Sequence, residues 1–323
     1  MKKLFISMLA VAALASCSQE DVIVADKGDL IGFNSFVENS TRAALDPSYG
    51  ANGAALKKFQ VWGTVNGGNG LVNIFNGDDV EGTVGAGNIW HCDVTQYWIK
   101  DATYNFAALV NATTDLTKVE GLPTEVKGFT ADGATDLLYA RSEANIKGKA
   151  SGNGPVNLNF EHLLSKVKFT VVNNSVDAEE YSFEVNSIVI KGKKTGDVAL
   201  SSKEWSNTSN EFPYEVDPIT VNADEDAGTD TAECAKELLL IPGDFNITFN
   251  VDIYNGTTKL GSQAYPIAPA VYNQTLKAGY AYNFVINVKV GEEITFSVTE
   301  QPTWNEDVNG DNKVDANDNI KLQ

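Results

Sequence analysis

The sequence predicts an all-β protein built from antiparallel β-sandwiches, and three observations carry this prediction. Apolar and polar residues alternate over many short segments, which is the pattern of half-buried strands. Clusters of Gly, Asn, Asp and Pro, such as 66–70 and 151–155, separate these segments and favour turns. Helical periodicity is confined to a brief stretch at 161–165. Short strands at regular spacing with turns between them are typical of sandwiches.

The alternating segments are rich in β-branched and aromatic residues, the types that fit a pleated and half-buried surface. In chain order the expected strands are 59–65, 104–110, 156–160, 167–171, 187–191, 238–241, 247–254 and 282–288. The stretch 159–171 has the pattern of a last strand, a tight turn and a first strand of a new unit. We therefore place a domain boundary near residue 166, with sandwiches at 43–165 and 166–304. The polar insert 222–237 is expected to be an exposed loop.

The N-terminus has the organisation of a secretory signal. Lys2 and Lys3 precede an apolar run from Leu4 to Ala15, and Cys17 follows at once with an acidic stretch at 18–21. The run is too short for a spanning helix, which needs about 20 residues. A cysteine after Leu-Ala-Ser is the lipoprotein form of this signal, so residues 1–16 are expected to be removed and Cys17 to be lipidated. The alternative is a plain signal peptide with an incidental cysteine.

Composition excludes several classes of function. Lys and Arg number 24 against 43 Asp and Glu, which gives a formal net charge of −19. Such a surface repels phosphate backbones, so no nucleic-acid partner is expected. Hydrophobic residues make up 43%, which is enough for a folded core. Beyond Cys17 only Cys92 and Cys234 remain, and they are expected to be unpaired buried thiols in different domains, with a pairing of the two as the alternative. Without a CxxC pair, no zinc site is expected.

Four features in order resemble the fimbrillins, the type V pilin-like surface lipoproteins of Bacteroidales. They are the lipobox with its acidic follow-on, the strand-like 30–37 leading into Asn39-Ser40-Thr41-Arg42-Ala43, the aromatic 97–99 followed by 104–108, and the mid-chain 136–140 and 158–167. The match spans roughly residues 1–304. We therefore predict that the protein is a member of this family.

The resemblance implies two β-sandwich domains of Greek-key, transthyretin-like topology and a role in fimbrial assembly and adhesion without catalysis. It implies a lipid-anchored precursor at the outer membrane, surface-exposed, with a propeptide at 17–42 and cleavage between Arg42 and Ala43 by an arginine-specific protease. The expected partners are other fimbrial subunits. The subunit's place, in the stalk or as a tip or accessory pilin, stays open. The alternative is a monomeric outer-membrane surface lipoprotein that binds a glycan or a host ligand.

The propeptide segment also has a physical logic of its own. Ile31, Phe33, Ser35 and Val37 fall on one face of a strand and need a partner sheet. If a protease cuts after Arg42, this strand can leave and expose an apolar groove with unpaired backbone groups. A strand from another subunit can then fill the groove by β-augmentation. The alternative is a short ordered linker with an incidental arginine.

A candidate donor strand lies near the other end of the chain. Ile294, Phe296 and Val298 show the same alternation and follow a hinge-like Gly291-Glu292-Glu293. This segment is expected to fill the vacated groove of a neighbouring subunit.

The acidic tail, 305–323, contains a stretch that fits a calcium-loop template. Its oxygen ligands would be Asp307, Asn309, Asp311, the Lys313 carbonyl, Asp315 and Asp318. The stretch also resembles half of a dockerin repeat, with Asn312 in place of the usual glycine and little chain after Asp318 to form an exiting helix. Calcium is therefore the expected cofactor, and a merely solvated acidic tail is the alternative.

The remaining constellations favour structural roles. His91 and His162, the two histidines, have no nucleophile or metal-ligand partner at a telling spacing, and no carboxylate pair stands out as catalytic. The chain is therefore not expected to be an enzyme. The five tryptophans, which would have to be exposed to form a sugar-stacking platform, are expected mainly in the core or as edge cover: Trp62, Trp90, Trp98, Trp205 and Trp304. Thr231 lies in a three-residue pattern that resembles a Bacteroidales O-glycosylation sequon.

Overall fold

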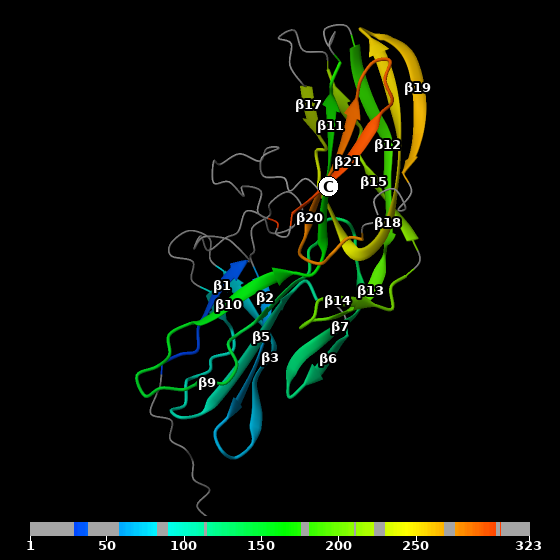
Figure 1. Ribbon diagram of the computed structural model, residues 1–323. Helices are drawn as coiled ribbons and strands as arrows, with labels where there is room; N and C mark the ends of the chain where they lie inside the picture. Colours follow the sequence, from blue (N-terminus) through cyan, green and yellow to red (C-terminus); the bar gives the residue numbers. More distant parts are fainter. Residues whose placement is uncertain are drawn as a thin grey trace, which may run out of the picture.

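A computed structural model describes the protein at residues 29–37, 58–82, 90–112, 115–175, 181–209, 211–222, 230–267, 275–301 and 304. The regular structure in these ranges is all β-strand, arranged in three sheets, so the prediction of an all-β protein is confirmed. No stretch within these ranges forms a helix of the length and apolarity that crossing a bilayer requires. Figure 1 shows an elongated molecule with the first half of the chain at one end and the second half at the other.

The first sheet contains eight strands and forms the lower part of Figure 1. They are β1 (Phe33–Val37), β2 (Lys58–Asn66), β3 (Leu71–Gly82), β4 (Trp90–Cys92), β5 (Thr103–Val110), β8 (Leu138–Arg141), β9 (Ile146–Lys147) and β10 (Val156–His162). Their order is β1-β10-β8-β5-β2-β3-β4, with β9 paired to β5. β1 and β4, the two ends of this order, approach each other, so the sheet curls around its own aromatic core.

The second sheet contains nine strands from the second half of the chain. They are β11 (Ser165–Asn173), β12 (Tyr181–Lys193), β15 (Glu211–Val216), β16 (Ile219–Val221), β17 (Asp230–Glu233), β18 (Leu238–Asn255), β19 (Thr258–Ile267), β20 (Ala281–Val288) and β21 (Thr295–Gln301). The long β18 pairs with β12 and β19 and, near its start, with β11, so it joins two layers. Between these layers the rings of Phe249 on β18 and Phe296 on β21 stack at 6.2 Å.

Two strand pairs are parallel, β1 with β10 and β11 with β20, whereas the other described pairs are antiparallel. The chain passes from the first sheet to the second between His162 and Ser165. The division into two tandem sandwiches with a boundary near residue 166 stays a prediction, and the third sheet crosses that boundary.

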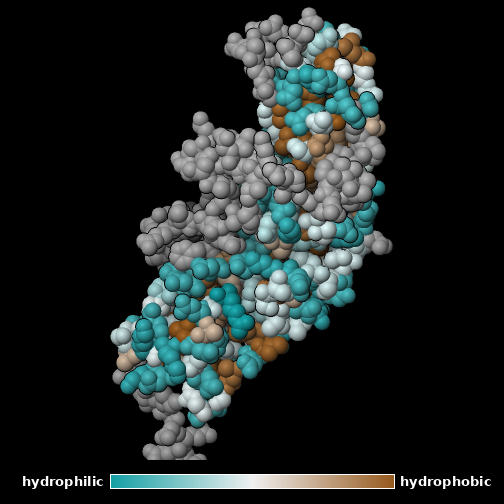
Figure 2. All heavy atoms as spheres, in the orientation of Figure 1, coloured by the Kyte–Doolittle hydropathy of each residue, from teal (hydrophilic) through white to brown (hydrophobic). Residues whose placement is uncertain are grey.

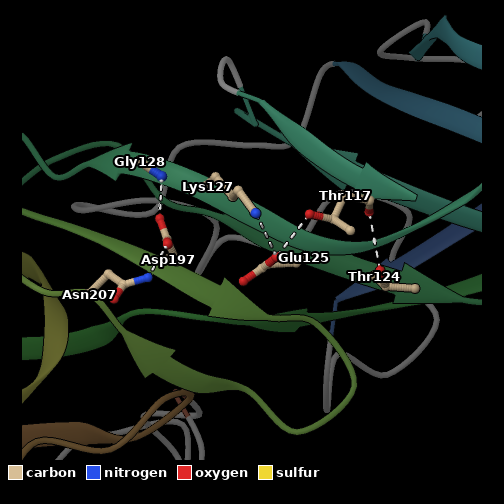
Figure 3. Close-up of polar contacts among 7 residues, drawn as sticks. All are labelled: Thr117, Thr124, Glu125, Lys127, Gly128, Asp197 and Asn207. Atoms are coloured by element: carbon tan, nitrogen blue, oxygen red, sulfur yellow. Dashed lines mark hydrogen bonds and ion pairs between the residues drawn. The ribbon is translucent and has the colours of Figure 1, made fainter. Parts of the chain in front are cut away.

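The third sheet contains β6 (Leu116–Val119), β7 (Leu122–Thr130), β13 (Thr195–Ala199) and β14 (Glu204–Ser206) in the order β14-β13-β7-β6. It therefore pairs β7 of the first half of the chain with β13 of the second half. Side chains link the strands of this sheet, as Figure 3 shows: Thr117 Oγ1 donates to the Glu125 carboxylate, and Lys127 Nζ lies 3.5 Å from the same carboxylate.

A β-bulge interrupts the pairing of β7 with β13 opposite Asp197. At the bulge Gly128 adopts φ +61°, a left-handed conformation that glycine reaches without steric cost. Its N–H donates to Asp197 Oδ1 at 2.7 Å, and Asn207 Nδ2 donates to Asp197 Oδ2 at 2.7 Å (Figure 3). These hydrogen bonds from Asn207 and Gly128 hold the pKa of the Asp197 carboxyl below its ordinary value, because they favour the ionised form. Asp197 thus satisfies a donor that the bulge would leave free.

Two local predictions are wrong. The stretch 161–165 is not helical, because β10 runs to His162, a turn occupies 163–164 and β11 begins at Ser165. Leu163 and Leu164 are both fully buried, so the pair of leucines belongs to the core of the turn and not to a helix face. The insert 222–237 is not all loop either, since β17 pairs with β11 along Asp230–Glu233, while 223–229 lie outside the described residues.

Candidate site for strand exchange

The segment expected to be removable is a strand packed into the core of the first sheet. Ile31, Phe33 and Ser35 are 6%, 4% and 5% exposed, so the predicted alternation places these three side chains inside. The side chain of Val37, the fourth residue of the predicted stripe, lies outside the described part of the structure.

Phe33 is the anchor of this strand. Its ring centroid lies 5.5 Å from that of Phe75, 5.9 Å from that of Phe106 and 6.2 Å from that of Phe59, with edge-to-face geometry in each case. Such aromatic pairs stabilise a fold by more than the burial of their apolar area alone. If β1 left, the rings of Phe59, Phe75 and Phe106 would lose the side chain that covers them.

The backbone of β1 is held by one neighbour. β1 pairs in parallel with β10, from Phe33 opposite Val156 to Val37 opposite Phe160, and β10 is its single partner among the described strands. Just before β1, the N–H of Val156 donates to the Gly32 carbonyl at 2.7 Å. Removal of β1 would therefore leave β10 with an unpaired edge beside an apolar groove, which is a template for another strand.

A loop grips the chain where it enters the sheet. The Ile31 N–H donates to the Gln96 carbonyl at 2.9 Å, and the Trp98 N–H donates to the Asp29 carbonyl at 3.1 Å. Leu30 and Tyr97, which form a β-bridge between these two hydrogen bonds, are both exposed apolar residues. We call residues 96–101 the clamp loop.

Tyr104 on β5 holds the clamp loop in its shape. Its hydroxyl accepts a hydrogen bond from the Ile99 N–H at 2.6 Å, and its ring meets that of Trp98 at 4.7 Å. Burial raises the pKa of Tyr104, so the phenol stays neutral and keeps its hydroxyl proton. The aromatic segment 97–99 is thus a backbone grip on the N-terminal strand, with Trp98 buried under it.

The candidate donor strand is seated in its own sheet. β21 pairs antiparallel with β20, from Thr295 opposite Asn287 to Gln301 opposite Ala281, and lies at the edge of the second sheet. Ile294, Phe296 and Val298 are half-buried and pack against the core of that half. Figure 1 shows β1 and β21 in different sheets, so one molecule holds both strands apart.

Several predicted site residues lie outside the described residues. They are Cys17, Arg42, Ala43 and the calcium candidates Asp307, Asn309, Asp311, Lys313, Asp315 and Asp318. Within the described ranges, no group of three or more His, Cys, Asp or Glu side chains is placed to hold a metal ion.

The aromatic and titratable candidates are mostly internal. Trp62, Trp90, Trp98 and Trp304 are buried, so they cannot form an exposed sugar-stacking platform, and Trp205 is half-buried. Cys92 and Cys234 are half-buried and unpaired. His91 lies in β4 opposite Glu81.

His162 has a partner that the sequence did not reveal. Its Nδ1 lies 2.6 Å from Asp136 Oδ2, and both side chains are buried. Asp136 belongs to the segment 136–140 that resembles the family, and the sequence alone assigns it no role.

The exposed surface is mainly polar, with small separate apolar patches on the face in Figure 2. The large apolar residues that are exposed in the described chain are Leu30, Leu71, Val72, Tyr97, Val119, Phe212 and Leu260. They come from several elements and form no single broad apolar face in that view.

Comparison with solved structures supports the same fold. The chain is similar to a fimbrial protein from Bacteroides vulgatus, with a TM-score of 0.57 and 15% identity over 85% of this chain and 99% of that one. Weaker similarities include a fimbrial anchor protein from Porphyromonas gingivalis (TM-score 0.36, 12% identity, 85% of this chain and 98% of that one). A fimbrial assembly protein from Parabacteroides distasonis is also similar (TM-score 0.39, 12% identity, 84% of this chain and 100% of that one). At these identities the first similarity shows a shared fold and no more, and among curated proteins no similar sequence was found.

The fold is therefore one that this chain shares with the fimbrial protein from Bacteroides vulgatus. A sequence profile of the fimbrillin-like family matches residues 41–302, and the chain belongs to this family. The predicted resemblance is confirmed. Its members are structural proteins and not enzymes.

Proposed function

We propose that this protein is a fimbrial building block whose first strand is cut away and replaced by a strand of a neighbouring subunit. The observation that supports the proposal most strongly is the position of β1: it is an edge strand with one pairing partner, yet its Phe33 and the preceding Ile31 are buried in the core. Burial of two such side chains stabilises the sheet by about 3 to 6 kcal/mol, so a vacated groove strongly favours a new occupant.

The sequence of β21 suits that groove. Ile294, Phe296 and Val298 have the same spacing as Ile31, Phe33 and Ser35, with isoleucine and phenylalanine at the first two places. In a second copy seated in this register, Phe296 would replace Phe33 against its three aromatic neighbours. β21 pairs with β20 alone among the described strands, so its transfer breaks a single ladder.

The proposed precursor is held at the outer membrane, facing outward, by lipid on Cys17. An arginine-specific protease then cuts between Arg42 and Ala43 and frees the segment that contains β1. The partners are other fimbrial subunits, and the assembled fimbrium supports adhesion. The hydrophilic tail after Trp304 is unlike a donated strand, so a tip or accessory position is favoured over the stalk.

The chain offers a sharp test because it contains two arginines, Arg42 and Arg141. Arg141 lies at the end of β8, between β10 and β5, and is paired with Ala107. A backbone held in a sheet resists proteolysis, so we expect an arginine-specific protease to cut the folded precursor after Arg42 alone. The product should begin at Ala43 and should form a ladder of assemblies on unboiled gels.

Two variants control this experiment. Arg42→Ala should stay whole and monomeric, whereas Arg141→Ala should be cut and should assemble as wild type does. In cells, Cys17→Ala should lose acyl labelling and membrane fractionation. A product that begins elsewhere, or a clean cut followed by no assembly with itself or with any partner pilin, would favour the monomeric ligand-binding alternative.

We also propose that the tail binds one calcium ion through the side-chain oxygens of Asp307, Asn309, Asp311, Asp315 and Asp318 and the Lys313 carbonyl. Four carboxylates in a short loop repel one another unless a cation neutralises them. Calorimetry should detect heat with millimolar calcium for wild type and little for an Asp307→Ala/Asp311→Ala double variant. Equal heats from both proteins would contradict the site.

A further inference from the structure

A buried polar cluster lies where the two halves of the chain meet. Asp136 precedes β8 and pairs with His162, the last residue of β10. The imidazole of His162 stacks on the indole of Trp304, with ring centroids 3.6 Å apart and planes inclined by 15°. Trp304 is 3% exposed, although it follows the end of β21 by only three residues.

The second half of the chain contacts the same indole. Lys166 on β11 is buried, and its Nζ lies 5.7 Å from the Trp304 ring and 3.6 Å from the Glu237 carboxylate. Lys166 Nζ also donates to the Trp304 carbonyl at 3.4 Å. Trp304 therefore rests on β10 and β11 at once, beyond the sheet edge to which β21 belongs.

The deep burial of Trp304 contrasts with the partial burial of β21. Ile294, Phe296 and Val298 are only half-buried, and β21 has one strand neighbour in the described structure. An edge strand with partial burial opens easily unless something fixes its end. Glu300 at the end of β21 pairs with Lys277 at 2.6 Å, and the most completely buried apolar side chain of this terminal segment is that of Trp304.

The burial of Trp304 and His162 also has an energetic cost. Within the described structure, His162 Nε2 and Trp304 Nε1 are buried without a hydrogen-bond partner. Buried polar atoms without partners are penalised relative to water, so part of the gain from stacking is offset. The Trp304 indole is thus held by ring contact and burial, and its release allows both nitrogens to be hydrated.

β10 contacts both β1 and Trp304, the residue that lies beyond the end of β21. β1 pairs with β10 from Val156 to Phe160, and His162 follows two residues later on the same strand. When β1 is present, β10 lies between β1 and β8, and when β1 is absent it becomes an edge strand. Edge strands open more readily, and His162 is the residue through which such loosening reaches Trp304.

We propose that Trp304 is a latch that keeps β21 in its own sheet while β1 is in place, and that loss of β1 from β10 opens it. The second part rests on the proposed function, because only strand removal makes the opening useful. Donor strand and acceptor groove would then become available together, which prevents uncut precursors from donating β21.

Hydrogen–deuterium exchange of the purified full chain tests the latch. In Trp304→Ala, exchange of the amides of Thr295–Gln301 should rise about tenfold or more, while those of β18 stay as in wild type. Trp304→Phe keeps a ring over His162 and should stay close to wild type. Trp205→Ala is the matched control, because the Trp205 indole donates to the Leu163 carbonyl at 2.9 Å in the same junction and belongs to β14, a strand of the third sheet.

Unchanged exchange of β21 in Trp304→Ala, or an equal rise in β18, would overturn the latch. If Trp304→Ala does not fold, a chain that keeps Trp304 as its one tryptophan decides: under mild denaturant, its indole emission and the exchange of β21 should change in one step, and two separate steps would overturn the latch. A Trp304-only background, with the other tryptophans replaced by phenylalanine, isolates the emission.

A separate arm of the experiment tests the coupling between β1 and the Trp304 latch. Phe33→Ala loosens β1 in the uncut chain without any protease, and it should raise exchange of Thr295–Gln301 severalfold. This arm still works if the cut after Arg42 fails, so failure of the proposed function and failure of the latch are distinguishable. Protected β21 in a folded Phe33→Ala chain whose β1 exchanges freely would overturn the coupling.

Discussion

Replacing Phe33 with alanine is expected to lower the free energy of unfolding of the uncut protein by about 3 kcal/mol. The side chain is buried and touches the rings of Phe59, Phe75 and Phe106. Alanine removes this contact and leaves a cavity that three packed rings fill only in part. Chemical denaturation, followed by the emission of the tryptophans in the first sheet, measures the loss.

Asn34→Ala is the matched control on the same strand. The Asn34 side chain points away from the core and donates to Asn157 Oδ1 at 3.2 Å at an exposed position, so its loss should cost less than about 1 kcal/mol. Similar destabilisation by Phe33→Ala and Asn34→Ala would mean that β1 does not depend on its buried face. It would also remove the main support for a groove that attracts a new strand.

Replacing Gly148 with alanine is expected to destabilise the protein by about 3 kcal/mol and to loosen the N-terminal strand. A Cβ at this position would lie 1.9 Å from the carbonyl oxygen of Ile99, which belongs to the clamp loop. The contact is with backbone, so no side-chain rotation relieves it. Because Trp98 precedes Ile99, the displacement reaches the hydrogen bond that the Trp98 N–H donates to the Asp29 carbonyl.

Gly32→Ala provides the comparison, since a Cβ there meets no atom within 4 Å. That change should lie within about 1 kcal/mol of wild type, because it mainly reduces the freedom of the unfolded chain. Thermal unfolding compares the two stabilities, and exchange of the Ile31 and Trp98 amides reports on the grip. A Gly148→Ala protein with wild-type stability and protected amides would show that the clamp loop adapts without cost.

The strands with clear alternation could be predicted from the sequence, because period two reflects a direct relation between neighbouring residues and the two faces of a sheet. Thus 59–65 and 104–110 fall in β2 and β5, and 282–288 falls in β20. Two predicted strands, 238–241 and 247–254, form one continuous β18, since the intervening Pro242 and Gly243 do not break it. The sequence pattern separates the two segments, whereas the structure has one strand whose pairing with β12 is irregular between Ile241 and Asn246.

Strand partners could not be predicted in the same way. The pairing of β7 with β13 joins residues about seventy positions apart, and nothing in either segment specifies the other. The burial of Ile31 and Phe33 was predicted because it depends on alternation alone. The clamp loop and the seat of Trp304 depend on how distant elements pack, so the sequence indicated only that these aromatic residues were present.

The third sheet has a mechanical consequence. The two halves of the chain are tied covalently at 163–164 and, at a separate place, by the ladder between β7 and β13. A body tied at more than one point resists bending, because rotation about one tie stretches another. A pull that separates the halves must therefore break a strand ladder before the covalent connection carries load. We expect the protein to transmit tension as one stiff body and not as two domains that are joined by a flexible linker.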